Sequence, residues 1–172
     1  MCKVIMNSKF QRVQEGGSGM AGKVYYSQVL LGRRQARVIL DGAFALARGQ
    51  AMPPLTVVVL DGGGHPVAVE REDGCAPLRF PVASGKAYAA LGNGVASSVI
   101  GARNAERPAF LASVAAASGG RSVPVAGGVL ILDDSQCVIG AVGVSGASSV
   151  EDERVAIAGI EAAGLTWGLE PE

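Results

Sequence analysis

The chain has 172 residues, 49% of them hydrophobic and only 17% charged, so it can bury a sizeable core and is not disordered by composition. Its 15 basic and 15 acidic residues cancel, which argues against nucleic acid as a partner, because nucleic-acid binders usually carry a basic excess. A neutral and poorly charged surface favours association, so we expect a homo-oligomer.

Residues 1–22 include the run Gln14-Glu15-Gly16-Gly17 and are expected to form a flexible leader, with residues 23–172 as a single domain. No apolar run reaches the length of a membrane span, and the N-terminus lacks the apolar segment of a secretory signal. Three cysteines without a C-x-x-C spacing argue against a structural zinc site. We therefore expect a cytoplasmic protein with neither a membrane partner nor a metal site.

The first half of the chain is predicted to contain a helix, a hairpin and two further helices. Apolar residues at helical spacing predict a helix over 26–49, which Gly49 and the following prolines end. The β-branched run at 55–60 predicts a strand, and after a glycine-rich turn the alternating residues from His65 predict its hairpin partner. Pro81 suits the first turn of a helix that continues through residue 91. Ser97 or Ser98 can cap a short helix that ends before Pro108.

The second half is predicted to be richer in strands. Residues 108–122 are expected to be a loop with some helix, and strands are predicted over 122–125, 128–133 and 137–144. A final helix is predicted over 149–163, with Gly164 just past its end. Short turns between consecutive strands imply antiparallel pairing, so the fold class is α+β, with a five-stranded antiparallel sheet and helices on its faces.

The loop between the last predicted strand and the last helix is a candidate ligand site. Backbone N–H groups around Ser145 and Gly146 are suited to a carboxylate, propionate or phosphate at the helix start. In the alternative interpretation, Ser148 or Ser149 caps the helix with Glu151 or Asp152 as its partner, and the two uses can coexist.

Cationic and phenolic side chains follow the hairpin. Arg71 can clamp a carboxylate through two N–H groups, or it can form a surface ion pair of little energetic value. Lys86 and Tyr88 can supply a cation and a phenol to a ligand, although such side chains more often lie at a surface.

His65 is the only histidine, and therefore the only candidate imidazole ligand for haem iron or imidazole general base. Its position after a glycine-rich turn also fits an exposed turn residue without a function. Cys75 is a second candidate ligand, or equally a small buried apolar residue.

Several motifs occur together and in order between Leu55 and Gly164. They are Val58-Val-Leu-Asp-Gly-Gly-Gly-His-Pro-Val-Ala, Glu70-Arg-Glu-Asp-Gly-Cys, Lys86-Ala-Tyr, Gly127-Gly-Val, Ile139-Gly-Ala-Val-Gly-Val-Ser-Gly and Asp152-Glu-Arg-Val-Ala. In this combination the chain resembles the GlcG/HbpS-like haem-binding family, which is also found fused to some corrinoid adenosyltransferases. The resemblance covers about residues 26–164.

The resemblance implies a profilin-like three-layer α/β/α fold, symmetric oligomers and haem as the cofactor, with no other cofactor expected. The chain departs from the family pattern at Leu130, where a proline is usual. It also lacks the histidine that haem-binding relatives carry toward the end of the chain, so haem would be held by His65, Cys75, Tyr88 or a weak ligand.

The candidate residues and the family resemblance together indicate two possible functions. As a haem-binding or haem-handling accessory protein, the chain would use Arg71, Lys86 and the loop N–H groups for the haem propionates. As a cofactor-independent enzyme (an isomerase, hydratase or lyase) or a metabolite-binding protein, it would hold substrate between the Gly127-Gly128 strand and the Ser145 loop. Asp73 or Glu153 would then move a proton. A structural oligomer without pocket chemistry is the third interpretation, and catalysis is left open.

Overall fold

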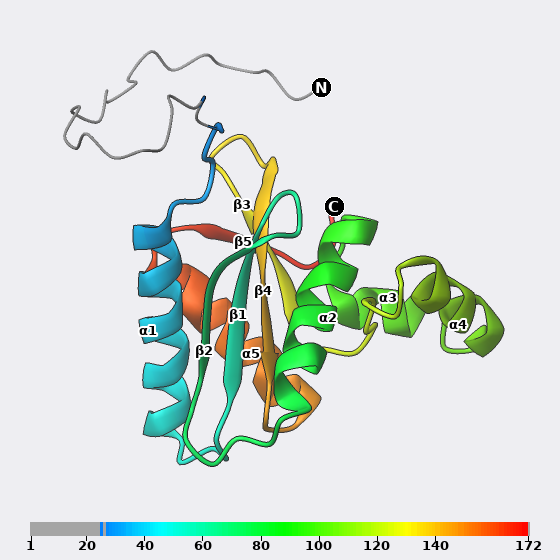
Figure 1. Ribbon diagram of the computed structural model, residues 1–172, viewed down its shortest axis with the longest axis horizontal. Coiled ribbons are helices and arrows are strands. Elements are labelled where there is room, and N and C mark those ends of the chain that lie inside the picture. Colours follow the sequence, from blue (N-terminus) through cyan, green and yellow to red (C-terminus); the bar gives the residue numbers. More distant parts are fainter. Residues whose placement is uncertain (1–24, 26, 172) are drawn as a thin grey trace, which may run out of the picture.

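The computed structural model describes residue 25 and residues 27–171, and the leader expected at 1–22 lies outside them. Its elements are α1 (Arg33–Gly49), β1 (Thr56–Asp61), β2 (Pro66–Arg71), α2 (Arg79–Asn93), α3 (Ser97–Arg103), α4 (Pro108–Ala117), β3 (Gly128–Leu132), β4 (Val138–Ser145), α5 (Ser149–Ala162) and β5 (Thr166–Gly168). Figure 1 shows the sheet between two helical layers, with α1 and α5 on one face and α2 on the other. None of the helices in the described part of the chain is long and apolar enough to cross a membrane.

The five strands form one sheet in the order β2-β1-β4-β3-β5, and all neighbouring strands are antiparallel. At its centre Val58 lies between Val69 of β2 and Gly143 of β4. The α+β class and the five-stranded antiparallel sheet are therefore confirmed.

Strand β1 is apolar from Val57 to Leu60, and both of its faces are covered. Val57 and Val59 belong to the core cluster that α1 and α5 complete, whereas Val58 and Leu60 belong to the cluster beneath α2. This alternation follows from the two-residue period of a strand.

Helix α2 lies in direct backbone contact with the sheet. A Cβ added at Gly143 would lie 2.0 Å from the carbonyl oxygen of Ala83, and one at Gly128 would lie 2.1 Å from the carbonyl oxygen of Lys86. Ala87, also on α2, is fully buried against the same strands. Small residues on both sides thus allow the helix and the strands to approach this closely.

Two predicted boundaries were wrong. The first helix begins at Arg33, not at 26, because Gly32 is an extended N-cap whose N–H donates to Gln35 Oε1 at 3.2 Å. Leu31 continues the apolar pattern but packs beside Gly140 of the sheet without being helical. The short third helix is capped by Ala96 and not by Ser97 or Ser98, since the Ser97 hydroxyl bonds elsewhere.

The fifth strand was predicted in the wrong place. Residues 122–125 are not a strand, because they cross the outside of α2, where Val123 N donates to Gly85 O at 3.1 Å. The fifth strand is instead β5, which pairs with β3 at the sheet edge. The 108–122 segment is also more regular than expected, since ten of its residues form α4. Figure 1 shows α3 and α4 projecting from the α2 side as an arm.

Candidate functional site

His65 lies in the β1–β2 turn with its side chain 79% exposed. The Asp61 carboxylate organises this turn by accepting the backbone N–H groups of Gly63 and His65, both at 2.9 Å. The His65 N–H holds the pKa of the Asp61 carboxyl below its ordinary value. Asp61 Oδ1 also lies 3.4 Å from His65 Nδ1, so the carboxylate restrains the orientation of the imidazole through Nδ1.

Tyr88 packs against this turn from α2. A Cβ added at Gly64, which has a φ of 79°, would lie 3.2 Å from the Tyr88 ring. Arg121 donates to the Tyr88 hydroxyl at 2.8 Å, and its guanidinium carbon lies 4.1 Å from the ring centroid. The structure therefore places Tyr88 against the turn that carries His65. Arg121 joins Tyr88 from beyond α4, a contact that no local sequence pattern predicts.

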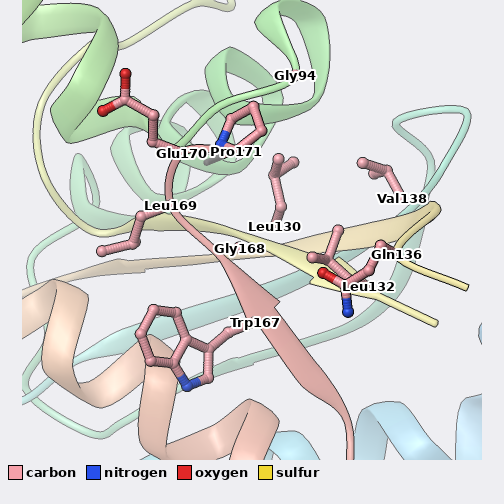
Figure 2. Close-up of a pocket in the computed structure, with 10 residues that line it drawn as sticks. All are labelled: Gly94, Leu130, Leu132, Gln136, Val138, Trp167, Gly168, Leu169, Glu170 and Pro171. Carbon is pink, nitrogen blue, oxygen red and sulfur yellow. The ribbon is translucent and has the colours of Figure 1, made fainter. Parts of the chain in front are cut away.

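A hollow of about 600 Å³ lies at the β3–β5 edge of the sheet. Figure 2 shows Leu130, Leu132, Trp167 and Leu169 around it. Leu130 is part of the side-chain cluster beneath α2, and Leu132 and Tyr88 both pack against that cluster. The full lining is Gly94, Leu130, Leu132, Gln136, Val138, Trp167, Gly168, Leu169, Glu170 and Pro171. Sequence analysis missed this hollow because it did not predict β5, which forms one wall.

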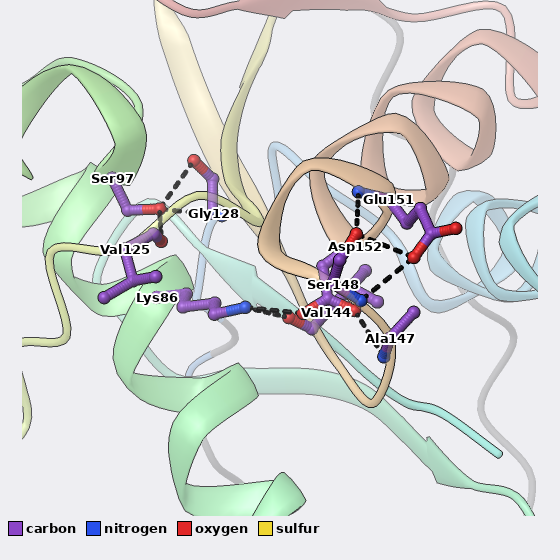
Figure 3. A network of polar contacts seen from close by, with 9 residues as sticks. All are labelled: Lys86, Ser97, Val125, Gly128, Val144, Ala147, Ser148, Glu151 and Asp152. Carbon is purple, nitrogen blue, oxygen red and sulfur yellow. Dashed lines mark hydrogen bonds and ion pairs between the residues drawn. The ribbon is translucent and has the colours of Figure 1, made fainter. Parts of the chain in front are cut away.

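Lys86 is buried, and only 3% of its side chain is exposed. Its ammonium donates to Asp152 Oδ2 at 2.7 Å and to Val144 O at 3.0 Å, as Figure 3 shows. Burial raises the pKa of Asp152, and the hydrogen bond and positive charge of Lys86 offset part of this effect. The expected propionate-binding cation is thus already engaged by a buried carboxylate.

The candidate loop around Ser145 and Gly146 is packed against the protein itself. Ser145 is 1% exposed, and a Cβ at Gly146 would lie 2.5 Å from Pro54 O. The N–H groups at the helix start are also engaged, because Ala147 N donates to Asp152 Oδ1 and Ser148 N donates to Glu151 Oε2, both at 3.0 Å. The capping interpretation is confirmed: Ser148 Oγ also accepts from Glu151 N.

Gly127 and Gly128 lie beside the buried lysine. A Cβ at Gly127 would lie 2.8 Å from Lys86 Nζ. The Gly128 N–H donates to Ser97 Oγ at 2.8 Å, and this hydroxyl donates to Val125 O at 2.6 Å (Figure 3). The predicted residues Lys86, Gly127 and Gly128 are therefore brought together, but in a packed polar network.

Arg71 and Asp73 line a second hollow of about 520 Å³, together with Met52, Pro54, Glu70 and Glu72. Arg71 donates to the carbonyl oxygen of Cys75 at 3.0 Å. The Cys75 thiol is buried, and its Sγ lies 3.3 Å from Thr56 Oγ1. Cys75 thus packs as a small buried residue, whereas Arg71 and Asp73 share an open surface.

Glu153 lies on α5, away from Arg71 and Asp73 in the sequence. Its Oε2 is buried and has no hydrogen-bond partner among the residues that the structure describes. Within residue 25 and residues 27–171, no group of three or more His, Cys, Asp or Glu side chains is placed to hold a metal ion.

Comparison with known families decides the classification. The family described as haem degrading proteins, HbpS-like, matches residues 31–161. The chain belongs to the HbpS-like family. No curated protein matches it.

Solved structures with the same fold agree with this membership of the HbpS-like family. A PduOC:haem complex has a TM-score of 0.73 and 22% identity, covering 83% of this chain and 100% of that chain. The Klebsiella pneumoniae protein ORFY has a TM-score of 0.70 and 22% identity, covering 83% and 98% of the two chains. A double mutant of Streptomyces reticuli HbpS has a TM-score of 0.67 and 22% identity, covering 87% and 97%. At these identities the likeness shows the fold.

Proposed function

We propose that this protein is a haem-binding or haem-handling accessory protein, with His65 as the iron ligand. The observation that carries the proposal is the exposed imidazole of His65, in a turn whose Gly64 packs against Tyr88 of α2. Nδ1 faces Asp61, which leaves Nε2 for a metal in the arrangement common to metal-bound histidines. Membership in a family of haem degrading proteins and the fold shared with a PduOC:haem complex support it.

The donor groups at this end of the molecule fit haem chemically. The His65 imidazole would supply a nitrogen ligand to the haem iron, and the exposed Arg121 guanidinium is suited to a propionate carboxylate. Leu130 and Leu132 of the edge hollow pack with the same cluster as Tyr88 and offer apolar surface suited to a porphyrin ring. Bound haem would supply redox-active iron, while His65 and Arg121 would hold and orient it.

A haemin titration of the purified full chain, followed in the Soret region, tests the proposal. We expect a saturable one-to-one shift that His65→Ala weakens by at least about tenfold in affinity. Arg121→Met should weaken binding less, because it removes one charge-assisted contact to a propionate. Arg48→Met, which removes an exposed arginine in the last turn of α1, is the matched control and should bind as the wild type does.

The three other outcomes differ in meaning. A shift that His65→Ala leaves unchanged would move the ligand to Tyr88 or Cys75, which Tyr88→Phe and Cys75→Ser would separate. Weakening in Arg48→Met equal to that in Arg121→Met would show nonspecific attraction to positive charge. The absence of any saturable shift would contradict haem binding by this chain.

The second candidate is a cofactor-independent enzyme for a small carboxylate. It is favoured by two observations: Arg71 and Asp73 share one hollow, and Glu153 Oε2 is buried without a described partner. Arg71 would orient the carboxylate, and Asp73 or Glu153 would transfer the proton. A colourless protein that fails the haemin titration would direct the search to small carboxylates.

A further inference from the structure

A third hollow, of about 470 Å³, lies between the segment that precedes α1 and the β1–β2 turn. Its volume falls within the roughly 300–1,000 Å³ that is typical of small-molecule sites. Neither His65 nor the candidate proton-transfer residues Asp73 and Glu153 line it. The chemistry of its own walls therefore indicates what it binds.

Apolar side chains line both the buried and the exposed parts of this hollow. Leu31 and Ile139 belong to the core cluster, and Val67 packs against that cluster. Val29 and Leu30 also line the hollow, yet they are 71% and 59% exposed. Because covering such side chains removes apolar surface from water, an apolar ligand in the hollow would be stabilised by them.

Arg33 is the one cation among the described residues that line the hollow. Its side chain is exposed and makes no hydrogen bond or ion pair within the described part of the chain. The first turn of α1 contains no acidic residue, and Arg37 is already paired with Asp41 and Glu70. A guanidinium group binds a carboxylate through two parallel N–H···O bonds, so Arg33 is suited to a ligand carboxylate.

Asp61 contributes the one carboxylate among the described lining residues. Its Oδ1 accepts the backbone N–H groups of Gly63 and His65, both at 2.9 Å, so this oxygen is already engaged within the turn. The negative charge of Asp61 repels a second carboxylate from the turn. A ligand carboxylate is therefore expected at Arg33 and its apolar part against the remaining walls.

We propose that this hollow binds a free carboxylate with an apolar chain, of the medium-chain fatty acid class. Arg33 would hold the carboxylate, and the chain would lie against Val29, Leu30 and Val67. Such a molecule matches both the apolar lining and the single cation, whereas a ligand with several charges would bury charge without a partner. The proposal does not depend on haem binding, because His65 does not line the hollow.

A titration of the isotope-labelled full chain with octanoate, followed by NMR, tests this site. We expect saturable shifts of the backbone amide signals of Gly62, Gly63 and Val67, with a Kd of about 0.1–1 mM for a ligand of this size. Octanol has the same chain without the carboxylate, so it should bind at least about fivefold more weakly. This difference should disappear in Arg33→Met, because that variant lacks the guanidinium.

Substitution of the exposed apolar wall tests the position of the chain. Val29→Ser combined with Leu30→Ser should weaken octanoate binding at least about tenfold, since less apolar surface is covered. Val150→Ser, at a valine of α5 that is 69% exposed, is the matched control and should bind as the wild type does. Arg48→Met is the corresponding control for Arg33→Met, because it removes an exposed arginine from the other end of α1.

The outcomes for this hollow and for haem are separable. The absence of saturable shifts at these amides, or an octanoate affinity that Arg33→Met leaves unchanged, would overturn the proposal. If haemin still bound in that case, the failure would concern this hollow alone. His65→Ala should retain octanoate binding, and octanoate binding by a chain that fails the haemin titration would support the hollow without haem.

Discussion

At the scale of the residue, Lys86 and Asp152 form a buried ion pair in the interior. Both side chains are nearly inaccessible, with 3% and 2% exposed, and their charged atoms lie 2.7 Å apart. The Lys86 ammonium also donates to Val144 O, and the Asp152 carboxylate also accepts from Ala147 N. Because both charges are removed from water, such a pair adds little net stability to the folded protein. The loss of one partner, however, leaves the other charge buried and unpaired.

Lys86→Met should therefore destabilise the protein by about 3–5 kcal/mol, as measured by urea unfolding. Lys86→Met combined with Asp152→Asn should recover part of this loss, because no unpaired charge stays buried. Arg48→Met, at an exposed position of α1, should change the free energy of unfolding by less than about 0.5 kcal/mol. A loss below about 1 kcal/mol for Lys86→Met would mean that Asp152 finds another partner or becomes protonated without cost.

Residue-level prediction succeeded where the interaction is local and failed where it is long-range. Ser148 and Glu151 are three residues apart, and their spacing alone predicts the capping box that the structure contains. Lys86 and Asp152 are 66 residues apart, so helical spacing on α2 could not show that the ammonium would be buried. Arg121 reaches Tyr88 only because the chain returns across α2 after the arm.

At the scale of the element, the contact between α2 and the sheet depends on residues without side chains. Gly143 of β4 faces the Ala83 carbonyl oxygen, and the approach leaves no room for a methyl group. Backbone atoms cannot move aside as the end of a flexible side chain can. Substitution there must displace the helix or bend the strand.

Gly143→Ala should consequently lower the free energy of unfolding by at least about 2 kcal/mol in chemical denaturation. Gly62→Ala is a matched control, because its nearest neighbour is 3.7 Å from the added Cβ and its backbone is not left-handed. That variant should stay within about 0.5 kcal/mol of the wild type. Equal stability of the two variants would show that α2 shifts freely on the sheet.

Element prediction was accurate for strongly patterned segments and poor for short ones. The strands predicted at 128–133 and 137–144 match β3 and β4 to within one residue, because both are continuous apolar runs beside a polar turn. β5 has only three residues, and its pairing with β3 gives it an extended form that its sequence does not indicate. Residues 122–125 have strand-like composition, but hydrogen bonds to α2 and α3 hold them outside the sheet.

At the scale of the whole molecule, the C-terminal segment connects the sheet to the arm. β5 pairs with β3, Leu169 O accepts from Ala96 N at the start of α3, and Glu170 pairs with Arg103 at the end of α3. The arm is thus held partly by residues that follow the last helix. The hollow at the β3–β5 edge includes the same segment.

Deletion of residues 166–172 should therefore destabilise the arm, formed by α3 and α4, more than it destabilises α1 on the opposite face of the sheet. Hydrogen exchange should accelerate at least about tenfold in α3 while the buried turns of α1 stay near wild-type protection. Glu170→Gln removes the exposed ion pair but keeps β5, and it should alter exchange little. Uniform acceleration across α1 and α3 would instead indicate that β5 supports the entire fold.

The close contact of α2 with the sheet also has a consequence for protein engineering. Because backbone meets backbone at Gly128 and Gly143, a ligand has no route between the helix and the central strands. New binding specificity must be installed at the rims, where the β1–β2 and β3–β4 turns connect strands whose registers are set by the sheet. A library that randomises these two turns, and retains Asp61 and Gly64, would vary the recognition surface without disturbing the scaffold beneath it.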